Sequence, residues 1–482
     1  MDSRLRAVVT VATVGVALLA SGSAVAGTGA LAGSLSRHAW GGAEEVPGIA
    51  ALNQGGNAEI ASVSCASAGN CSAGGQYMDS SVRRQAFVVS QANGTWGAAI
   101  EVPGTAALNQ GGNAFITSVS CASAGNCSAG GYYRDSSGHF QAFVVSQVIG
   151  TWGAAIEVPG TAALNQGGNA EIASVSCASA DNCSAGGYYR DGFSQRQAFV
   201  VNQANGTWHT AVKVPVAAAL RHGNASITSV SCGSAGNCSA GGEYLDNSRG
   251  HQAFVVSQAH GIWGTAIEVP GTAALNHGNA DLSSVSCASA DNCSAGGYYT
   301  NSSSRQQAFV VSQVNRTWHV AVEVPGLAAL NQSGFAGISS VSCASTGNCS
   351  ASGIYMDGSD HFPAFVVSQV SGTWGAAIEV PGIAALNQGG NADLSSVSCA
   401  SAGNCGAGGH YTDSSSRQQA FVVSQANRTW HVAVEVPGTA ALNQGGFAGI
   451  SSVSCASAGN CGAGGYYKDS SGHIQAFVVS EK

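Results

Sequence analysis

Cysteine is the residue type with the clearest chemistry in this sequence. The 482 residues include 16 cysteines, which fall into eight Cys-x5-Cys pairs. The thiols of one pair can close a disulfide across a short hairpin, or they can supply two ligands to a metal ion. One pair alone offers too few ligands, at a spacing unlike that of zinc modules, so we predict eight local disulfides. The pairs are Cys65 and Cys71, Cys121 and Cys127, Cys177 and Cys183, Cys232 and Cys238, Cys287 and Cys293, Cys343 and Cys349, Cys399 and Cys405, and Cys455 and Cys461.

Four carboxylates recur at one position in every second repeat: Glu59, Glu171, Asp281 and Asp393. If the repeats close into a ring, as argued below, these groups surround its axis, where like charges raise one another's pKa unless a cation lies between them. Carboxylate and asparagine oxygens suit a hard ion, so we predict a candidate calcium site with water-mediated contacts. The alternative is a set of solvated acids inherited from duplication of a two-blade unit.

One repeat carries basic residues that the other copies lack. Lys213 replaces a repeated glutamate, Arg221 and His222 replace Asn-Gln in a connection, and Arg249 and His251 follow in the next variable loop. If these side chains converge, they form a candidate binding site for an anion such as sialic acid. Sequence drift in a single copy explains the pattern equally well.

No residue set in the sequence predicts catalysis. A glutamate precedes Val-Pro in most repeats, on the strand face opposite a tryptophan, and such a recurrent group is typical of a solvated or ion-paired surface position. Its copies are Glu45, Glu101, Glu157, Glu268, Glu323, Glu379 and Glu435. The sequence has no Gly-rich phosphate loop, Ser-His-Asp arrangement or zinc signature. We therefore name no catalytic residue and favour a non-catalytic function.

The elements that position these residues follow from the repeat. The tryptophans recur every 55 or 56 residues, at Trp40, Trp96, Trp152, Trp208, Trp263, Trp318, Trp374 and Trp430. Each unit contains four short β-rich runs, which in one copy are "FITSVSCA", "CSAGGYY", "QAFVVSQ" and "WGAAIEV". Four strands per unit in eight units predict an all-β fold, an eight-bladed β-propeller of four-stranded antiparallel blades with one disulfide in each blade.

The two ends of the repeat region predict how the ring closes. The run "WGGAEEVPG" from Trp40 is a fourth strand without its first three, and the final "QAFVVSEK" is a third strand without a fourth. Pairing the two completes the last blade and removes an open sheet edge. We therefore expect one propeller domain over residues 40–482.

The repeat unit resembles known propeller families. The motif "SVSCASAGNCSAGG" followed by "NGTW" resembles the Cys-containing repeats of bacterial secreted propeller proteins, over nearly all of the chain after residue 40. More distantly, "SQANGTW" resembles the Asp box of sialidase-type propellers, with a turn one residue shorter and Asn93 where an aspartate is expected. The resemblance implies a propeller fold and no particular activity.

The N-terminal residues predict export. Arg4 and Arg6 precede the apolar run "AVVTVATVGVALLA", and Ala24-Val25-Ala26 offers a cleavage site, so residues 1–26 are typical of a secretory signal peptide. Residues 27–39 then form a short extension. No later run approaches the ~18 apolar residues of a membrane span. Export agrees with the predicted disulfides, and we expect a secreted, extracellular monomer.

Composition limits the partners. The formal net charge is -8 and only 9% of residues are charged, which argues against a nucleic-acid partner. The loops between the second and third strands vary most, and several begin after tyrosine pairs such as Tyr132 and Tyr133. We therefore predict a binding, adhesion or scaffold propeller for an extracellular glycan or protein. The alternatives are a carbohydrate-active enzyme, whether sialidase-like glycosidase or lyase, with its site in these loops, and an inert structural repeat protein.

Overall fold

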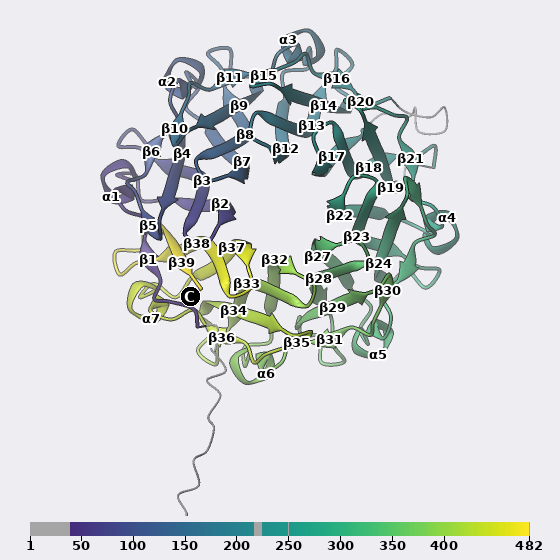
Figure 1. Ribbon diagram of the computed structural model, residues 1–482. Helices are drawn as coiled ribbons and strands as arrows, with labels where there is room; N and C mark the ends of the chain where they lie inside the picture. The colour runs from purple at the N-terminus through teal and green to yellow at the C-terminus, as the bar shows by residue number, and fades with distance from the viewer. Residues whose placement is uncertain (1–38, 216–223, 249, 482) are drawn as a thin grey trace, which may run out of the picture. The chain divides into compact units, whose positions relative to one another are not determined.

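A computed structural model describes residues 39–215, 224–248 and 250–481. The described chain forms eight antiparallel sheets that follow one another around a common centre (Figure 1). This arrangement confirms the predicted eight-bladed propeller. No helix in the described part is long and apolar enough to cross a membrane.

The first four blades share one strand order. They contain β2 (Glu59–Ser67), β3 (Asn70–Met78), β4 (Arg84–Ala92), β5 (Thr95–Trp96) and β6 (Ile100–Glu101); β7 (Ala114–Ser123), β8 (Asn126–Arg134), β9 (Phe140–Val148), β10 (Thr151–Trp152) and β11 (Ile156–Glu157); β12 (Ala170–Ser179), β13 (Asn182–Arg190), β14 (Arg196–Ala204), β15 (Thr207–Trp208) and β16 (Val212–Lys213); and β17 (Ser226–Ser234), β18 (Asn237–Leu245), β19 (His251–Ala259), β20 (Ile262–Trp263) and β21 (Ile267–Glu268).

The remaining blades repeat this order and end at the closing strand. They contain β22 (Ala280–Ser289), β23 (Asn292–Thr300), β24 (Gln306–Val314), β25 (Thr317–Trp318) and β26 (Val322–Glu323); β27 (Ala336–Ser345), β28 (Asn348–Tyr355), β29 (Ala364–Val370), β30 (Thr373–Trp374) and β31 (Ile378–Glu379); β32 (Ala392–Ser401), β33 (Asn404–Thr412), β34 (Gln418–Ala426), β35 (Thr429–Trp430) and β36 (Val434–Glu435); and β37 (Ala448–Ser457), β38 (Asn460–Lys468), β39 (Ile474–Ser480) and β1 (Glu44–Glu45).

Two local features differ from the expected blade. The fourth strand is not continuous, because two short strands pair separately with the third, as β10 and β11 do with β9. Between them Gly153 N donates to Ser146 O at 2.9 Å, which holds the bulged segment against the third strand. The connections between blades also contain single helical turns that the sequence analysis did not predict. They are α1 (Ile49–Leu52), α2 (Thr105–Leu108), α3 (Thr161–Leu164), α4 (Thr272–Leu275), α5 (Leu327–Leu330), α6 (Ile383–Leu386) and α7 (Thr439–Leu442).

Ring closure follows the prediction. Strand β1 pairs antiparallel with β39, with Glu44 opposite Val478, and the sheet order is β1-β39-β38-β37. Trp40 forms a further bridge to Glu481. The earliest described strand thus completes the last blade.

All eight predicted disulfides are present, and none of the 16 cysteines, all of which lie in the described ranges, is free. Each links the first two strands of one blade, and the two Cα atoms of Cys121 and Cys127 lie 4.0 Å apart. This is closer than the ~4.5 to 5.5 Å of ordinary facing residues. A register shift between Cys121 and Ser123 marks a β-bulge that bends the strand at this point.

The hydrophobic core lies between neighbouring blades. On β4, Phe87 and Val89 pack in a cluster shared with the last blade, whereas Val88 packs in a cluster shared with the second blade. The third strand of each blade is therefore buried on both faces. This explains its continuous apolar run "AFVV", because strands covered on both sides lose the usual alternation.

Serine side chains join the innermost strands of neighbouring blades. Val119 N donates to Ser62 Oγ and Cys121 N donates to Ser64 Oγ, both at 2.9 Å. The same two bonds recur at every interface, including the one between the last and first blades. An innermost strand has one edge without a sheet partner, so the serines of "SVSC" satisfy amides that would otherwise lack acceptors.

Removing one of these hydroxyls tests their contribution. Ser120→Ala leaves the Cys177 amide without its 2.9 Å acceptor, and we expect the free energy of unfolding to fall by about 1 kcal/mol. Urea denaturation followed by tryptophan fluorescence measures the change. The control is Ser136→Ala, at an exposed turn position in the same blade. Equal midpoints for the two variants would contradict the assigned role.

Candidate functional site

Most repeated polar residues hold the blades together. The glutamate before each Val-Pro accepts a hydrogen bond from a tyrosine hydroxyl at the end of the second strand, for example Tyr133 to Glu157 at 3.0 Å. The same bond forms at the other six copies. Burial, reinforced by the glutamate charge, raises the pKa of Tyr133. The repeated glutamate, predicted to be solvated or ion-paired, is partly exposed and accepts from a tyrosine, and the second tyrosine of each pair belongs to the core.

The variable loops also have structural duties. Asp79 Oδ1 accepts from the amides of Ser81 and Arg83, and its Oδ2 accepts from Gln85 Nε2 at 2.9 Å. Basic side chains in these loops reach the next connection, as Arg417 does by donating to the carbonyl of Asn443 at 3.0 Å. Much of each loop is thus committed to turn formation and to blade packing.

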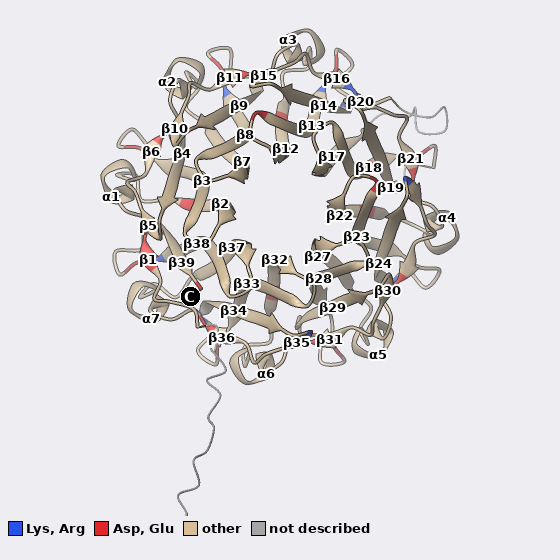
Figure 2. Ribbon diagram, in the orientation of Figure 1, with Lys and Arg blue, Asp and Glu red and all other residues tan. Residues whose placement is uncertain are grey.

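The four carboxylates predicted to bind calcium lie on separate blades. They stand at or next to the first residue of β2, β12, β22 and β32, which occupy different sectors of the ring (Figure 2). Within the described ranges, no group of three or more His, Cys, Asp or Glu residues is placed to hold a metal ion. The structure therefore does not bring Glu59, Glu171, Asp281 and Asp393 together, and water-mediated calcium binding stays a prediction.

The predicted anion site is described only in part. Arg221, His222 and Arg249 lie outside the described residues. Lys213 is exposed on the outer strand β16, whereas His251 begins β19 and contacts Glu243, with Nδ1 and Oε2 2.5 Å apart. The structure does not join these two basic residues, and the anion site stays a prediction.

Three of the residues named from the sequence, Glu171, His251 and Asp281, belong to a cluster that was not predicted and that spans three neighbouring blades. We call it the blade 3–5 cluster; its members are Glu171, Tyr188, Arg196, Glu243, His251, Asp281 and Tyr298. They stand at the beginning of the first and third strands and at the end of the second, so they share the face of the ring that carries the connections.

Arg196 connects the first half of the cluster. Its guanidinium carbon lies 4.3 Å from the centroid of the Tyr188 ring, and its Nη1 lies 3.8 Å from Glu243 Oε1 in the next blade. Arg196 also faces Glu171, where burial raises the pKa of the carboxyl and the guanidinium opposes this rise. The side chains of Arg196 and His251 remain 36% and 41% exposed, so a ligand can reach them.

Asp281 has fewer interactions that stabilise its ionised carboxylate than Glu171 or Glu243. Burial first, and the neighbouring Glu243 charge second, raise the pKa of Asp281 to about 6. Its Oδ1 is buried and has no hydrogen-bond partner in the described structure. Two carboxyl groups from adjacent blades thus differ in their partners. Glu243 contacts Arg196 and His251 directly, whereas the Leu282 amide and the charge of His251 only partly oppose the rise in the pKa of Asp281.

One sequence signal would have revealed this cluster. Glu243 stands in "GGEYLD", where three of the other copies carry Gln, Ile or His and four carry Tyr.

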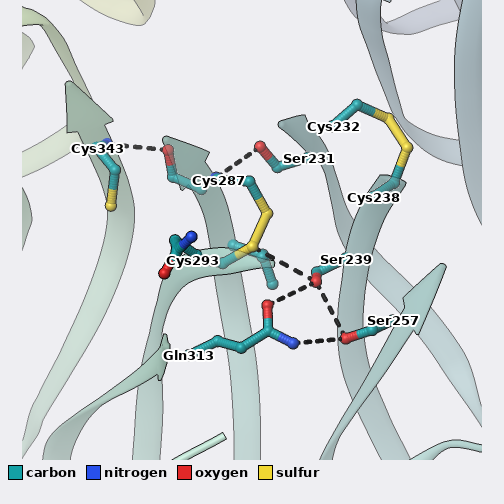
Figure 3. The surroundings of a disulfide bond; sticks show 12 residues. Ser231, Cys232, Cys238, Ser239, Ser257, Cys287, Cys293, Gln313 and Cys343 are labelled. Carbon is teal, nitrogen blue, oxygen red and sulfur yellow. Dashed lines mark hydrogen bonds between the residues drawn. A yellow bond between two sulfur atoms is a disulfide. The ribbon is translucent and has the colours of Figure 1, made fainter. Parts of the chain in front are cut away.

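Another departure from the repeat lies in the same sector. At four interfaces a glutamine of one blade bonds two serines of the preceding blade, as Gln313 does with Ser239 and Ser257 (Figure 3). Between the third and fourth blades Asn202 replaces the second serine. Asn202 Oδ1 accepts from Ser184 and Trp263, and both amide atoms of the buried Gln258 are left without a partner among the described atoms.

Comparisons with known proteins give no family. No protein family model matches the sequence, and no curated protein matches it. Among solved structures, the Hadza microbial sialidase Hz136 is 10% identical, with 71% of this chain and 73% of the sialidase covered and a TM-score of 0.34. The GH93 α-L-arabinofuranosidase of Fusarium graminearum is 12% identical over 64% of this chain and 93% of its own, with a TM-score of 0.34.

A family PL25 ulvan lyase is also similar, with 9% identity, 83% of this chain and 95% of the lyase covered, and a TM-score of 0.40. Similarities of this size carry no argument about substrate or activity. The functional inference therefore depends on the blade 3–5 cluster itself.

The unpaired Gln258 amide gives a stability prediction. Asn202→Ser restores the serine found at the other interfaces, and we expect it to raise the free energy of unfolding by about 1–3 kcal/mol, the cost of leaving a buried polar group unsatisfied. The matched control is the reverse change in the preceding blade, Ser146→Asn. It should lower stability, because Gln203 Nε2 donates to Ser146 Oγ at 3.0 Å. Chemical denaturation compares the two, and shifts of the same sign would contradict this account.

Proposed function

We propose that this protein is a glycan-binding propeller of an oxidising compartment and that its ligand binds at the blade 3–5 cluster. The observation that carries the proposal is the blade 3–5 cluster, in which Glu243 replaces the Tyr, Gln, Ile or His of the other copies and contacts both Arg196 and His251. Two further departures lie in the same sector. Lys213 replaces a glutamate that bonds a tyrosine of its own blade elsewhere, and Asn202 replaces a serine that bonds the glutamine of the next blade elsewhere. Natural proteins break local structural rules mainly where function requires it.

The cluster has the chemistry of a carbohydrate site. Tyr298 is half-buried and offers part of its ring to the apolar face of a sugar, while Arg196, Glu243 and His251 offer donors and acceptors to hydroxyl groups. Phe193, 89% exposed in the turn before Arg196, adds a second aromatic surface on the same face of the ring. The blades beneath hold these side chains rigidly, which reduces the entropy lost on binding.

The disulfides support the proposed compartment. Eight structural disulfides are typical of proteins that fold outside the reducing cytosol. Extracellular glycans are abundant ligands in such surroundings, and the predicted signal peptide, which lies outside the described residues, agrees with this location.

A glycan array followed by titration calorimetry tests the proposal. We expect Tyr298→Ala and Glu243→Gln each to weaken binding of the best ligand at least tenfold, which corresponds to about 1.4 kcal/mol. The control is Tyr132→Ala, which occupies the position of Tyr298 in the second blade. No binding on the array, or an equal loss in the control, would leave the inert structural protein as the better account.

Hydrolysis of a glycosidic bond is a second candidate function, favoured by the paired carboxyl groups of Glu243 and Asp281. A protonated carboxyl can donate to the leaving oxygen while an ionised one activates water. With a pKa of about 6, Asp281 carries the required proton below that pH.

Release of new reducing ends from the array-selected glycan measures this activity. We expect the rate to fall as the pH rises through 6, because Asp281 then loses its proton, and we expect Asp281→Asn to abolish release. A parent protein that binds the glycan and leaves it intact between pH 4 and 8 would exclude hydrolysis.

A further inference from the structure

The repeat allows the surroundings of equivalent carboxylates to be compared. Glu59 faces Arg84, and Glu171 faces Arg196; these arginines begin the third strands β4 and β14. In the fifth blade the same strand, β24, begins with Gln306. Asp281 therefore lacks the guanidinium that accompanies its counterparts in the first and third blades.

In the seventh blade the equivalent carboxylate has other partners in place of an arginine. Asp393 accepts a hydrogen bond from Ser395 Oγ at 3.2 Å and interacts with His410 of the paired strand. Around Asp281 the nearest charged groups are Glu243, a second carboxylate, and His251, which already contacts Glu243. Of the four recurrent acids, Asp281 alone has a buried oxygen without a hydrogen-bond partner in the described structure.

An arginine is thus absent beside Asp281 and Asp393, and of these two only Asp281 has an oxygen without a hydrogen-bond partner among the described atoms. Glu243 is already satisfied, because Ser226 Oγ donates to its Oε1 at 3.4 Å, Arg196 Nη1 lies 3.8 Å from the same oxygen, and His251 contacts Oε2. Tyr298 is paired with Asp281 across the two strands, and burial first, then the charges of Asp281 and Glu243, raise the pKa of its hydroxyl. Carboxylates beside an aromatic ring are a typical environment for a bound ammonium group.

We propose that Asp281 and Glu243 bind a protonated amino group of the ligand, in the place that arginine fills in the first and third blades. This inference rests on the proposed glycan-binding function and names its substrate class: a glycan with free amino groups, such as a de-N-acetylated hexosamine polymer. An ammonium group donates three hydrogen bonds and can engage both carboxylates. A bare metal ion fits less well, since no three candidate ligands in the described chain are grouped to hold one.

The test compares two oligosaccharides that differ in N-acetylation, which converts the charged amine into a neutral amide. Titration calorimetry at pH 6 uses a hexamer of glucosamine and a hexamer of N-acetylglucosamine. We expect the parent protein to bind the glucosamine hexamer at least tenfold more tightly, and Asp281→Asn to abolish this preference. Glu59→Gln is the matched control, because Glu59 has its own arginine, and it should keep the preference. Thermal melting of each variant verifies folding.

The pH dependence gives an independent readout. Asp281 must be ionised and the sugar amine protonated for binding, so affinity for the glucosamine hexamer should rise from about pH 4 to pH 6, before the amines lose their protons. The groups that face Asp281 are Glu243, His251 and Tyr298. A flat profile would contradict the proposal.

The outcomes separate the two proposals. If both hexamers bind the parent equally, the amine site is overturned and glycan binding stands. If neither binds while a glycan without amino groups binds on the array, the amine site is again overturned alone. If no glycan binds and a lysine-rich peptide does, both proposals are overturned in favour of a basic protein partner.

Discussion

The structure depends on hydrogen bonds between serine hydroxyls and the backbone of the neighbouring innermost strand. Each blade presents one unpaired strand edge toward the centre of the ring, and amides there need acceptors. Ser62 and Ser64 supply them to Val119 and Cys121. Because each blade binds the next in the same way, the contacts close only when the last blade reaches the first. The "SVSC" motif therefore encodes both a strand and its attachment to the following blade.

The features that could be predicted from the sequence are those that depend on the period of the repeat. The blade number, the closing strand and all disulfides follow from spacings along the chain, and these features are present in the structure. The tyrosine–glutamate bonds and the break in the fourth strand did not follow, because they depend on which side chains meet across a blade. The blade 3–5 cluster was hidden for a related reason. Arg196 and Glu243 belong to different repeats, and their contact depends on packing between blades.

The third and fourth blades lack some of the hydrogen bonds that the repeat forms elsewhere. Gln258 has lost both partners, and Lys213 stands where other blades have a tyrosine-bound glutamate. A ring of equivalent interfaces tolerates such losses, because the remaining blades retain their hydrogen bonds and cores. Because the other blades keep the ring closed, the residues of one sector can change without a change in fold. The proposed binding site depends on such a difference between blades.

Closure by β1 also makes ring formation an intramolecular binding reaction. Strand β1 pairs with the last blade, where Trp40 bridges to Glu481 and Tyr467 donates a hydrogen bond to Glu45. The β1 strand of a second molecule could make the same contacts and so compete for this place. Because β1 belongs to the same chain, its effective concentration at the last blade is of order millimolar. This is higher than the concentration of β1 strands from other molecules in a dilute solution. Self-closure therefore prevails over exchange between molecules. At high protein concentration the advantage of the intramolecular strand over a strand from another molecule becomes smaller. Exchange of β1 between molecules would then link rings into linear arrays.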